Sequence, residues 1–338
     1  MVQLSLGLLW IIDALLQLAP RMFTSAFANN IIAPTAQGQP GFVAALVHFG
    51  TRIILLHPAV SDTLIAIIQL LIGGLIIYKR SVRIGLIVSV VWSILVWIFG
   101  EGFAGIFSGH ALLLMGAPGA AIIYGILALA LLPARSKAKS FNTKRSTSVA
   151  AWLVFIWAGL WIGGAVLQLL PGQNSASSVG QMISINARHS PSWIRQTDAD
   201  LARTITGLSH GSSKTAMVSE MGMTIASSTG STNSGYLLIW LLSVVQLAIG
   251  LLVFANRFWR RSALVAGIVL SLAFWVFGQN FGGIFSGLAT DLNSGPLFIL
   301  LALAILGTKN ISQYLSRIGQ RIERWLIGAN TSLKEPLV

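Results

Sequence analysis

The chain has no cysteine and very little charge. Among its 338 residues only 9% are charged, with 22 Lys+Arg against 9 Asp+Glu, whereas a soluble domain carries about a quarter. The absence of cysteine excludes disulfides, thiolate metal sites, iron–sulfur ligation and a cysteine nucleophile. Because 55% of the residues are hydrophobic, so few charges cannot cover the water-facing surface of a soluble protein of this size.

The hydrophobic residues form long runs rather than alternating with polar ones. Residues 64–78, 84–100 and 237–255 contain no formal charge, and a membrane span needs about 20 mainly apolar residues. We expect eight spans, at about 4–20, 60–78, 84–100, 116–133, 149–170, 236–255, 263–279 and 295–308. The predicted fold is all-α, a polytopic integral membrane protein embedded in the lipid bilayer.

The basic residues indicate how the spans are oriented. Of the 22 Lys+Arg, 16 lie in the segments that follow the second, fourth, sixth and eighth spans. By the positive-inside rule, both termini are predicted to be cytoplasmic, in a multi-pass protein of the plasma membrane. This distribution accounts for the formal net charge of +13 without a nucleic-acid partner. The last segment, 309–338, is predicted to form an amphipathic helix on the inner leaflet followed by a tail.

The sequence is similar to itself. A shift of 151 residues places Trp10 on Trp161 and Pro20 on Pro171, and a shift of 178 places the string 105–109 on 283–287 and Pro118 on Pro296. The extra residues fall in about 209–234, a Ser-, Thr- and Gly-rich stretch typical of an exposed loop. We therefore predict two parallel four-helix units. The predicted boundaries are 1–133 for the first unit, 134–148 for a basic cytoplasmic linker, and 149–308 for the second unit with its outer loop 171–234.

Asp13 is the clearest candidate for chemistry, because ionisable groups within the hydrocarbon are costly and often functional. It lies in the middle of the first span, and Gln17 follows one turn later on the same face. Asp13 could carry a transported proton or bind a quinone head group; the alternative is a neutral acid that hydrogen-bonds a neighbouring helix. Its counterpart in the second unit is Gly164, so the units differ here.

Glu101 lies in a Gly- and aromatic-rich segment, 97–109, and its counterpart is Gln279. Matched, interrupted segments in the two halves of a repeated membrane protein often mark a binding site, although glycines can also serve close helix packing. The candidate polar membrane site also includes several other residues: Arg52, His110, Gln168, Arg203, Gln246 and Asp291. No His or Met cluster has metal-ligand spacing, and no motif identifies a catalytic residue.

The segment 7–20, the four-span unit and the Gly-rich connection between its third and fourth spans resemble the DoxX-like/DoxD superfamily of small bacterial and archaeal membrane proteins. DoxD-type proteins are linked to thiosulfate oxidation with electrons passed to quinone. The resemblance covers most of both units. It implies a redox accessory role, other membrane or redox proteins as partners, and quinone as a cofactor that is not covalently bound.

Three functions remain open at this point. The first is a quinone- or redox-linked accessory subunit, with Asp13, Glu101 and Arg52 around a cavity near the outer leaflet. The second is a small-solute or ion transporter or channel with its path between the two repeats. The third is a non-catalytic scaffold that uses 171–234 as a docking surface. The unequal pairs Asp13/Gly164 and Glu101/Gln279 favour a specialised first unit.

Overall fold

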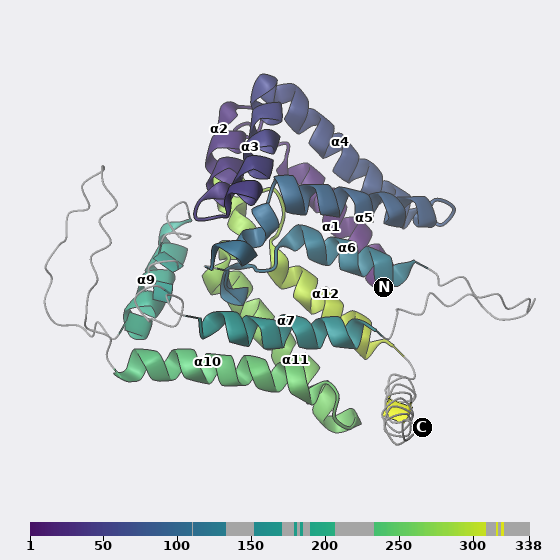
Figure 1. Ribbon diagram of the computed structural model, residues 1–338. Helices are drawn as coiled ribbons and strands as arrows, with labels where there is room; N and C mark the ends of the chain where they lie inside the picture. Colours follow the sequence, from purple (N-terminus) through teal and green to yellow (C-terminus); the bar gives the residue numbers. More distant parts are fainter. Residues whose placement is uncertain are drawn as a thin grey trace, which may run out of the picture.

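The computed structural model describes residues 1–109, 111–132, 152–170, 190–206 and 233–308, together with 179, 180, 183, 184, 316, 319 and 320. These residues form helices and connecting turns, with no strand among them (Figure 1). The structure therefore agrees with the predicted all-α class.

The first half of the chain contains six α-helices and four short 3₁₀ or π segments (η) among the described residues. They are α1 (Val2–Leu16), α2 (Ser25–Phe27), η1 (Ala28–Ile32), η2 (Ala33–Ala36), α3 (Gly41–Leu56), α4 (Pro58–Ile77), α5 (Val82–Phe99), η3 (Gly102–Ser108), η4 (Leu113–Met115) and α6 (Ala120–Leu131). The second half contains α7 (Leu153–Gln168), α9 (Ser192–Thr206), α10 (Asn233–Leu252), α11 (Arg257–Ala273), η6 (Phe274–Gly278), η7 (Asn280–Ser286) and α12 (Ser294–Leu306).

A helix lies within or over each of the eight ranges predicted as spans. Three helical stretches are long and apolar enough to cross a membrane by length and composition: Pro58–Ile77, Val82–Phe99 and Arg257–Ser286. The others are apolar but shorter in their described parts. Residues 41–56 also form a helix, α3, between the first two predicted spans.

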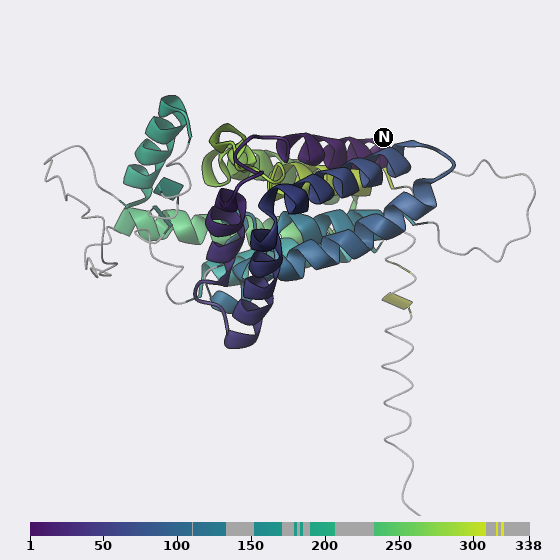
Figure 2. The ribbon, with the colours of Figure 1, turned by 90° about the horizontal axis from the view of Figure 1, so that it is seen from above.

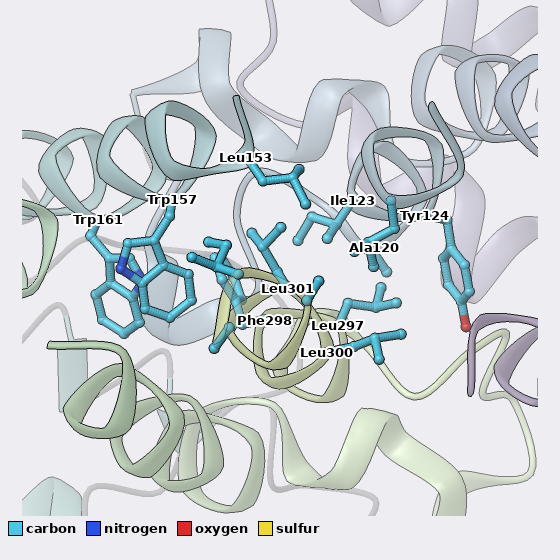
Figure 3. Packing of buried hydrophobic residues seen from close by; sticks show 14 of the residues in the cluster. Ala120, Ile123, Tyr124, Leu153, Trp157, Trp161, Leu297, Phe298, Leu300 and Leu301 are labelled. Carbon is cyan, nitrogen blue, oxygen red and sulfur yellow. The ribbon is translucent and has the colours of Figure 1, made fainter. Parts of the chain in front are cut away.

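The helices separate into an inner and an outer set. In Figure 3, Leu297, Leu300 and Leu301 of α12 pack between α6 and α7, and both α6 and α12 are buried along most of their length. Helices α4, α5, α10 and α11 instead expose large apolar side chains, such as Leu71, Val91 and Val269. Water would oppose such a surface, whereas lipid tails accommodate it.

Glycines allow α1 and α4 to approach closely in the first half, and α7 and α10 in the second. A Cβ added to Gly73 on α4 would lie 2.7 Å from the backbone oxygen of Gly7 on α1. A Cβ added to Gly250 on α10 would lie 3.1 Å from the backbone oxygen of Ala158 on α7. Small residues at such crossings let helix backbones pack without an intervening side chain.

The basic turns gather at one end of the molecule. Figures 1 and 2 show the N-terminus and the α4–α5 turn at one end, with α3 and α9 toward the other. In Figure 1 the α10–α11 turn and the end of α12 lie near the N-terminal end as well. The predicted linker 134–148, the amphipathic helix and tail within 309–338, and most of the outer loop 171–234 lie outside the described residues; α9 forms within that loop.

Candidate functional site

Each half contains a left-handed turn just after the helix predicted as its third span. The turn follows α5 in the first half, and α11 with η6 in the second. Residues 102–105 have φ between +51° and +73°, and residues 280–283 have φ between +47° and +73°. Four of these eight residues are not glycine, and a left-handed conformation costs such residues about 1–2 kcal/mol each. Strained backbone of this kind clusters at functional sites.

A tryptophan stabilises each turn in the same way. Trp97 Nε1 donates to the backbone oxygen of Pro118 at 2.7 Å, and Trp275 Nε1 donates to that of Leu292 at 2.7 Å. Each indole also meets a phenylalanine of its turn edge-on, Phe103 at 4.8 Å and Phe281 at 5.0 Å between ring centroids. These bonds pair Pro118 with Leu292, whereas the sequence alignment placed Pro118 on Pro296. The connection from the left-handed turn to α12 is therefore shorter than the connection from the first left-handed turn to α6.

Glu101 and Gln279 occupy equivalent positions beside the start of the last helix of each half, which is α6 for Glu101 and α12 for Gln279. The Ala121 backbone N–H donates to Glu101 Oε1 at 3.0 Å, and the Gly295 backbone N–H donates to Gln279 Oε1 at 2.9 Å. Helix N-termini favour a negative group because their first N–H groups lack helical partners. Glu101 is thus held at the N-terminus of α6.

A cavity of about 700 Å³ lies beside this helix start. Its polar lining includes three carboxyl groups, from Asp13 of α1, Glu101 after α5 and Asp291 before α12. Gln17 and Gln69 also line it and are buried, as is Asp13. The described residues contain no group of three His, Cys, Asp or Glu side chains that could hold a metal ion, so the three carboxyls are too dispersed for a metal centre.

Several buried polar atoms around the cavity have no hydrogen-bond partner in the part of the chain that the structure describes. They are both carboxyl oxygens of Asp13, Gln17 Oε1, Gln69 Oε1, Trp92 Nε1 and Glu101 Oε2. The Tyr124 hydroxyl and the Leu292 backbone N–H lie beside Asp13, but neither contact has hydrogen-bond geometry, and both Asp13 oxygens remain unpaired among the described residues. Unpaired buried polar groups cost about 1–3 kcal/mol each, and a polar ligand in the cavity would remove that cost.

Asp291 comes from the second half of the chain and completes the cavity. Thr290 Oγ1 donates to Asp291 Oδ2 at 2.8 Å, and the Asn293 backbone N–H donates to Oδ1 at 2.6 Å. Burial raises the pKa of Asp291, and these two hydrogen bonds partly offset the rise. The connection before α12 therefore holds the Asp291 carboxyl group in a fixed position at the cavity.

Most of the rest of the lining is apolar and continues onto the outer surface. Leu64 and Ile68 of α4 and Leu95 and Phe99 of α5 belong to it, and Leu64 and Leu95 are exposed. In Figure 1, α4 and α5 diverge from their turn toward α3. A ligand could therefore reach the polar end from the lipid-facing side between these helices.

The equivalent region of the second unit is filled. Gly164, the counterpart of Asp13, is so close to Leu113 that an added Cβ would lie 3.0 Å from Leu113 Cδ2. Gln279, the counterpart of Glu101, is fully paired, because its Nε2 also donates to Ser294 Oγ at 3.1 Å. Phe298, at the position matching Tyr124 when Ala121 is paired with Gly295, is buried.

The predicted site residues fall into three groups. Asp13, Gln17, Glu101 and Asp291 line the cavity together. Gln168, Gln246 and Gln279 are buried in the second unit and do not line it. Arg52 is exposed on α3, outside the lining, and Arg203 is exposed and pairs with Asp200 on α9; His110 lies outside the described residues.

Sequence reasoning missed several polar contributors to the cavity, among them Gln69, Trp92 and Tyr124. The match of Gln69 with Gln246 in the repeat was the available signal for one of them. Tyr124 stands in an apolar run, where an aromatic residue is expected to pack; in Figure 3 it lies at the edge of the core with its hydroxyl turned away from the core residues.

No family model, curated protein or solved structure matches the chain. The function therefore has to be argued from the site itself.

Proposed function

We propose that the protein is a quinone-binding, redox-linked accessory subunit of a membrane complex, of the DoxX-like/DoxD type. In this proposal eight helices cross the plasma membrane as two fused, parallel four-helix units, with both termini in the cytoplasm. The paired left-handed turns, the paired tryptophan hydrogen bonds and the paired glycine crossings support the duplication.

The cavity is the observation that supports a quinone as the ligand. A quinone has two carbonyl acceptors on a flat ring and an apolar tail. The Trp92 indole N–H and the carboxyl groups of Asp13 and Glu101, when protonated, are donors without a partner among the described residues at the polar end. The volume of about 700 Å³ lies within the range of small-molecule sites. The apolar wall between α4 and α5 suits a tail that remains in the bilayer.

The test is quinone binding to the full chain purified in mild detergent. We expect quinone in an organic extract of the protein, and saturable quenching of tryptophan fluorescence by a short-chain quinone, because Trp10 and Trp92 line the cavity. Asp13→Asn changes the hydrogen-bonding capacity of the site with little change in shape, and should weaken binding about tenfold.

Asp62→Asn is the matched control. Asp62 is a fully buried acid with unpaired oxygens on α4, and it does not line the cavity. Its substitution should leave quinone affinity unchanged. The absence of saturable quenching, or equal losses in the two variants, would contradict the proposal.

A transporter is the second candidate, because the cavity takes residues from both halves, with Asp291 and Asn293 from the second unit. Uptake of a small solute or ions into proteoliposomes, abolished by Asp13→Asn and accompanied by no quinone binding, would favour it over the redox subunit.

A further inference from the structure

A second hollow lies at the start of α11 and shares no lining residue with the cavity. It is lined by Arg257, Phe258, Arg261, Ser262, Val265 and Ala266. Arg257 and Arg261 are one helical turn apart, so they lie on the same face. Both are exposed, and neither forms an ion pair with a residue that the structure describes.

The arginine between them has a different role. Arg260 is buried, and it donates to the backbone oxygens of Val253 and Ala255, each at 2.9 Å. It therefore satisfies carbonyl groups at the end of α10, where helical partners are missing. This leaves Arg257 and Arg261 as the two cations directed at the surroundings.

An apolar stripe continues from the two arginines along α11. Phe258, Val265, Val269 and Leu272 are 47–68% exposed and recur at helical spacing, so they form one lipid-facing surface. The start of α11 also carries the partial positive charge of a helix N-terminus. The complementary ligand has an anionic head next to a long hydrocarbon chain.

A similar arrangement occurs in the first half, where Lys79 lies in the turn just before α5. The shift of 178 residues places Lys79 on Arg257 and Arg83 on Arg261. Ile87, Val91 and Ile94, which match Val265, Val269 and Leu272, are likewise exposed. Residues 78–84 and 253–262 contain no acid, so nothing within either turn neutralises the basic pair.

We propose that the start of α11 binds an anionic diacyl phospholipid, with the phosphate between Arg257 and Arg261 and one acyl chain along the stripe. Lys79 and Arg83 form the equivalent site at α5. Arginine suits the role because its guanidinium group binds phosphate through two parallel hydrogen bonds.

The experiment titrates the purified full chain in neutral detergent with phosphatidylglycerol and follows the thermal unfolding temperature. We expect a saturable rise with phosphatidylglycerol and a much smaller one with phosphatidylcholine. Arg257→Gln with Arg261→Gln should raise the half-saturating phosphatidylglycerol concentration about thirtyfold, as expected for the loss of two cations at a lipid surface. Arg257→Lys with Arg261→Lys keeps both charges. It should raise the logarithm of the half-saturating phosphatidylglycerol concentration by about a third or less of the rise caused by the glutamine variant.

The control is Arg52→Gln with Arg195→Gln, which removes two exposed positive charges from α3 and α9. It should leave the titration unchanged. Three results would overturn the proposal: an equal loss in the control, an equal response to phosphatidylcholine, or the same stabilisation by inorganic phosphate alone. If the glutamine double variant does not fold, the lysine variant and the lipid comparison still decide the question.

Discussion

At the scale of single residues, Glu101 combines a structural role with the binding role that we propose for it. Its Oε1 accepts the Ala121 N–H, while its Oε2 faces the cavity lining without a partner. Gln279 shows that an amide can make the same bond to the helix start, and that it can use its second atom for Ser294. The helix start therefore requires an oxygen at this position, and the carboxyl group itself is available for the ligand.

This division predicts different outcomes for two substitutions of Glu101. Glu101→Gln keeps an oxygen for the Ala121 N–H, so the thermal unfolding temperature in detergent should change little. Glu101→Ala removes it and should destabilise the protein by about 1–2 kcal/mol, as for loss of a helix cap. Both should weaken quinone binding. If Glu101→Gln destabilised the protein as much as Glu101→Ala, the charge would be part of the fold.

The single residues also show how far the sequence predicts the site. Asp13 and Glu101 stood out because a charge interrupts an apolar run. Tyr124 and Trp92 did not, because aromatic residues in such runs normally pack. Asp291 could be named as a candidate, but its approach to the first unit depends on how the connection before α12 folds, which no pattern within one unit reveals.

At the scale of elements, α9 takes the place in the second unit that α3 has in the first. A Cβ added to Gly102 would lie 3.0 Å from Val47 Cγ2 of α3. The shifts of 151 and 178 residues place Val47 on Asp198 and Gly102 on Asn280. The apolar contact in the first half thus corresponds to two neighbouring buried polar side chains in the second, Asp198 of α9 and Asn280 of η7. Their contact lacks hydrogen-bond geometry. Trp193 of α9 also packs on Phe281, with 6.2 Å between ring centroids.

The polar contact predicts that docking of α9 depends on pH. Burial raises the pKa of Asp198 from 3.8 to about 7, with the Asn280 amide partly offsetting the rise. A released α9 would give up this proton at lower pH than docked α9, so docking should weaken as the pH rises from about 4 to about 7 and then level off. Hydrogen exchange of the α9 amides, corrected for intrinsic rates, should lose at least about tenfold of its protection over this range.

Asp198→Asn should remove this pH dependence and keep α9 protected. Asp200→Asn is the control on the same helix, because Asp200 is exposed and pairs with Arg203; its pH dependence should match that of the unaltered protein. Equal behaviour of the two variants would rule out Asp198 as the cause. The sequence did not predict this helix, because α9 lies in a stretch whose polar composition suggested a loop.

At the scale of the whole molecule, composition and periodicity predict the helices well and their alignment less well. Apolar runs located the long helices because a lipid-facing helix needs apolar residues on every side. The similarity of the sequence to itself also located both left-handed turns, since glycine and aromatic strings are distinctive. Pro118 was nevertheless placed on Pro296, because proline identity outweighed a shorter connection in the second half. The hydrogen bonds of Trp97 and Trp275, and those of Glu101 and Gln279, reveal that connection.

The predicted orientation can be tested with the chain as it stands, because it has no cysteine and any introduced thiol is unique. Tyr78 at the end of α4 and Gln196 on α9 are both exposed. If the basic turns face the cytoplasm, a membrane-impermeant maleimide should label Gln196→Cys in intact cells and Tyr78→Cys only after permeabilisation. Figure 2 places the α4–α5 turn and α9 at opposite ends of the molecule, so the two results should be reciprocal. The reverse pattern would invert the orientation and move the arginines of α11 to the outer leaflet, whereas labelling of both in intact cells would mean that α4 and α9 are not separated by the bilayer.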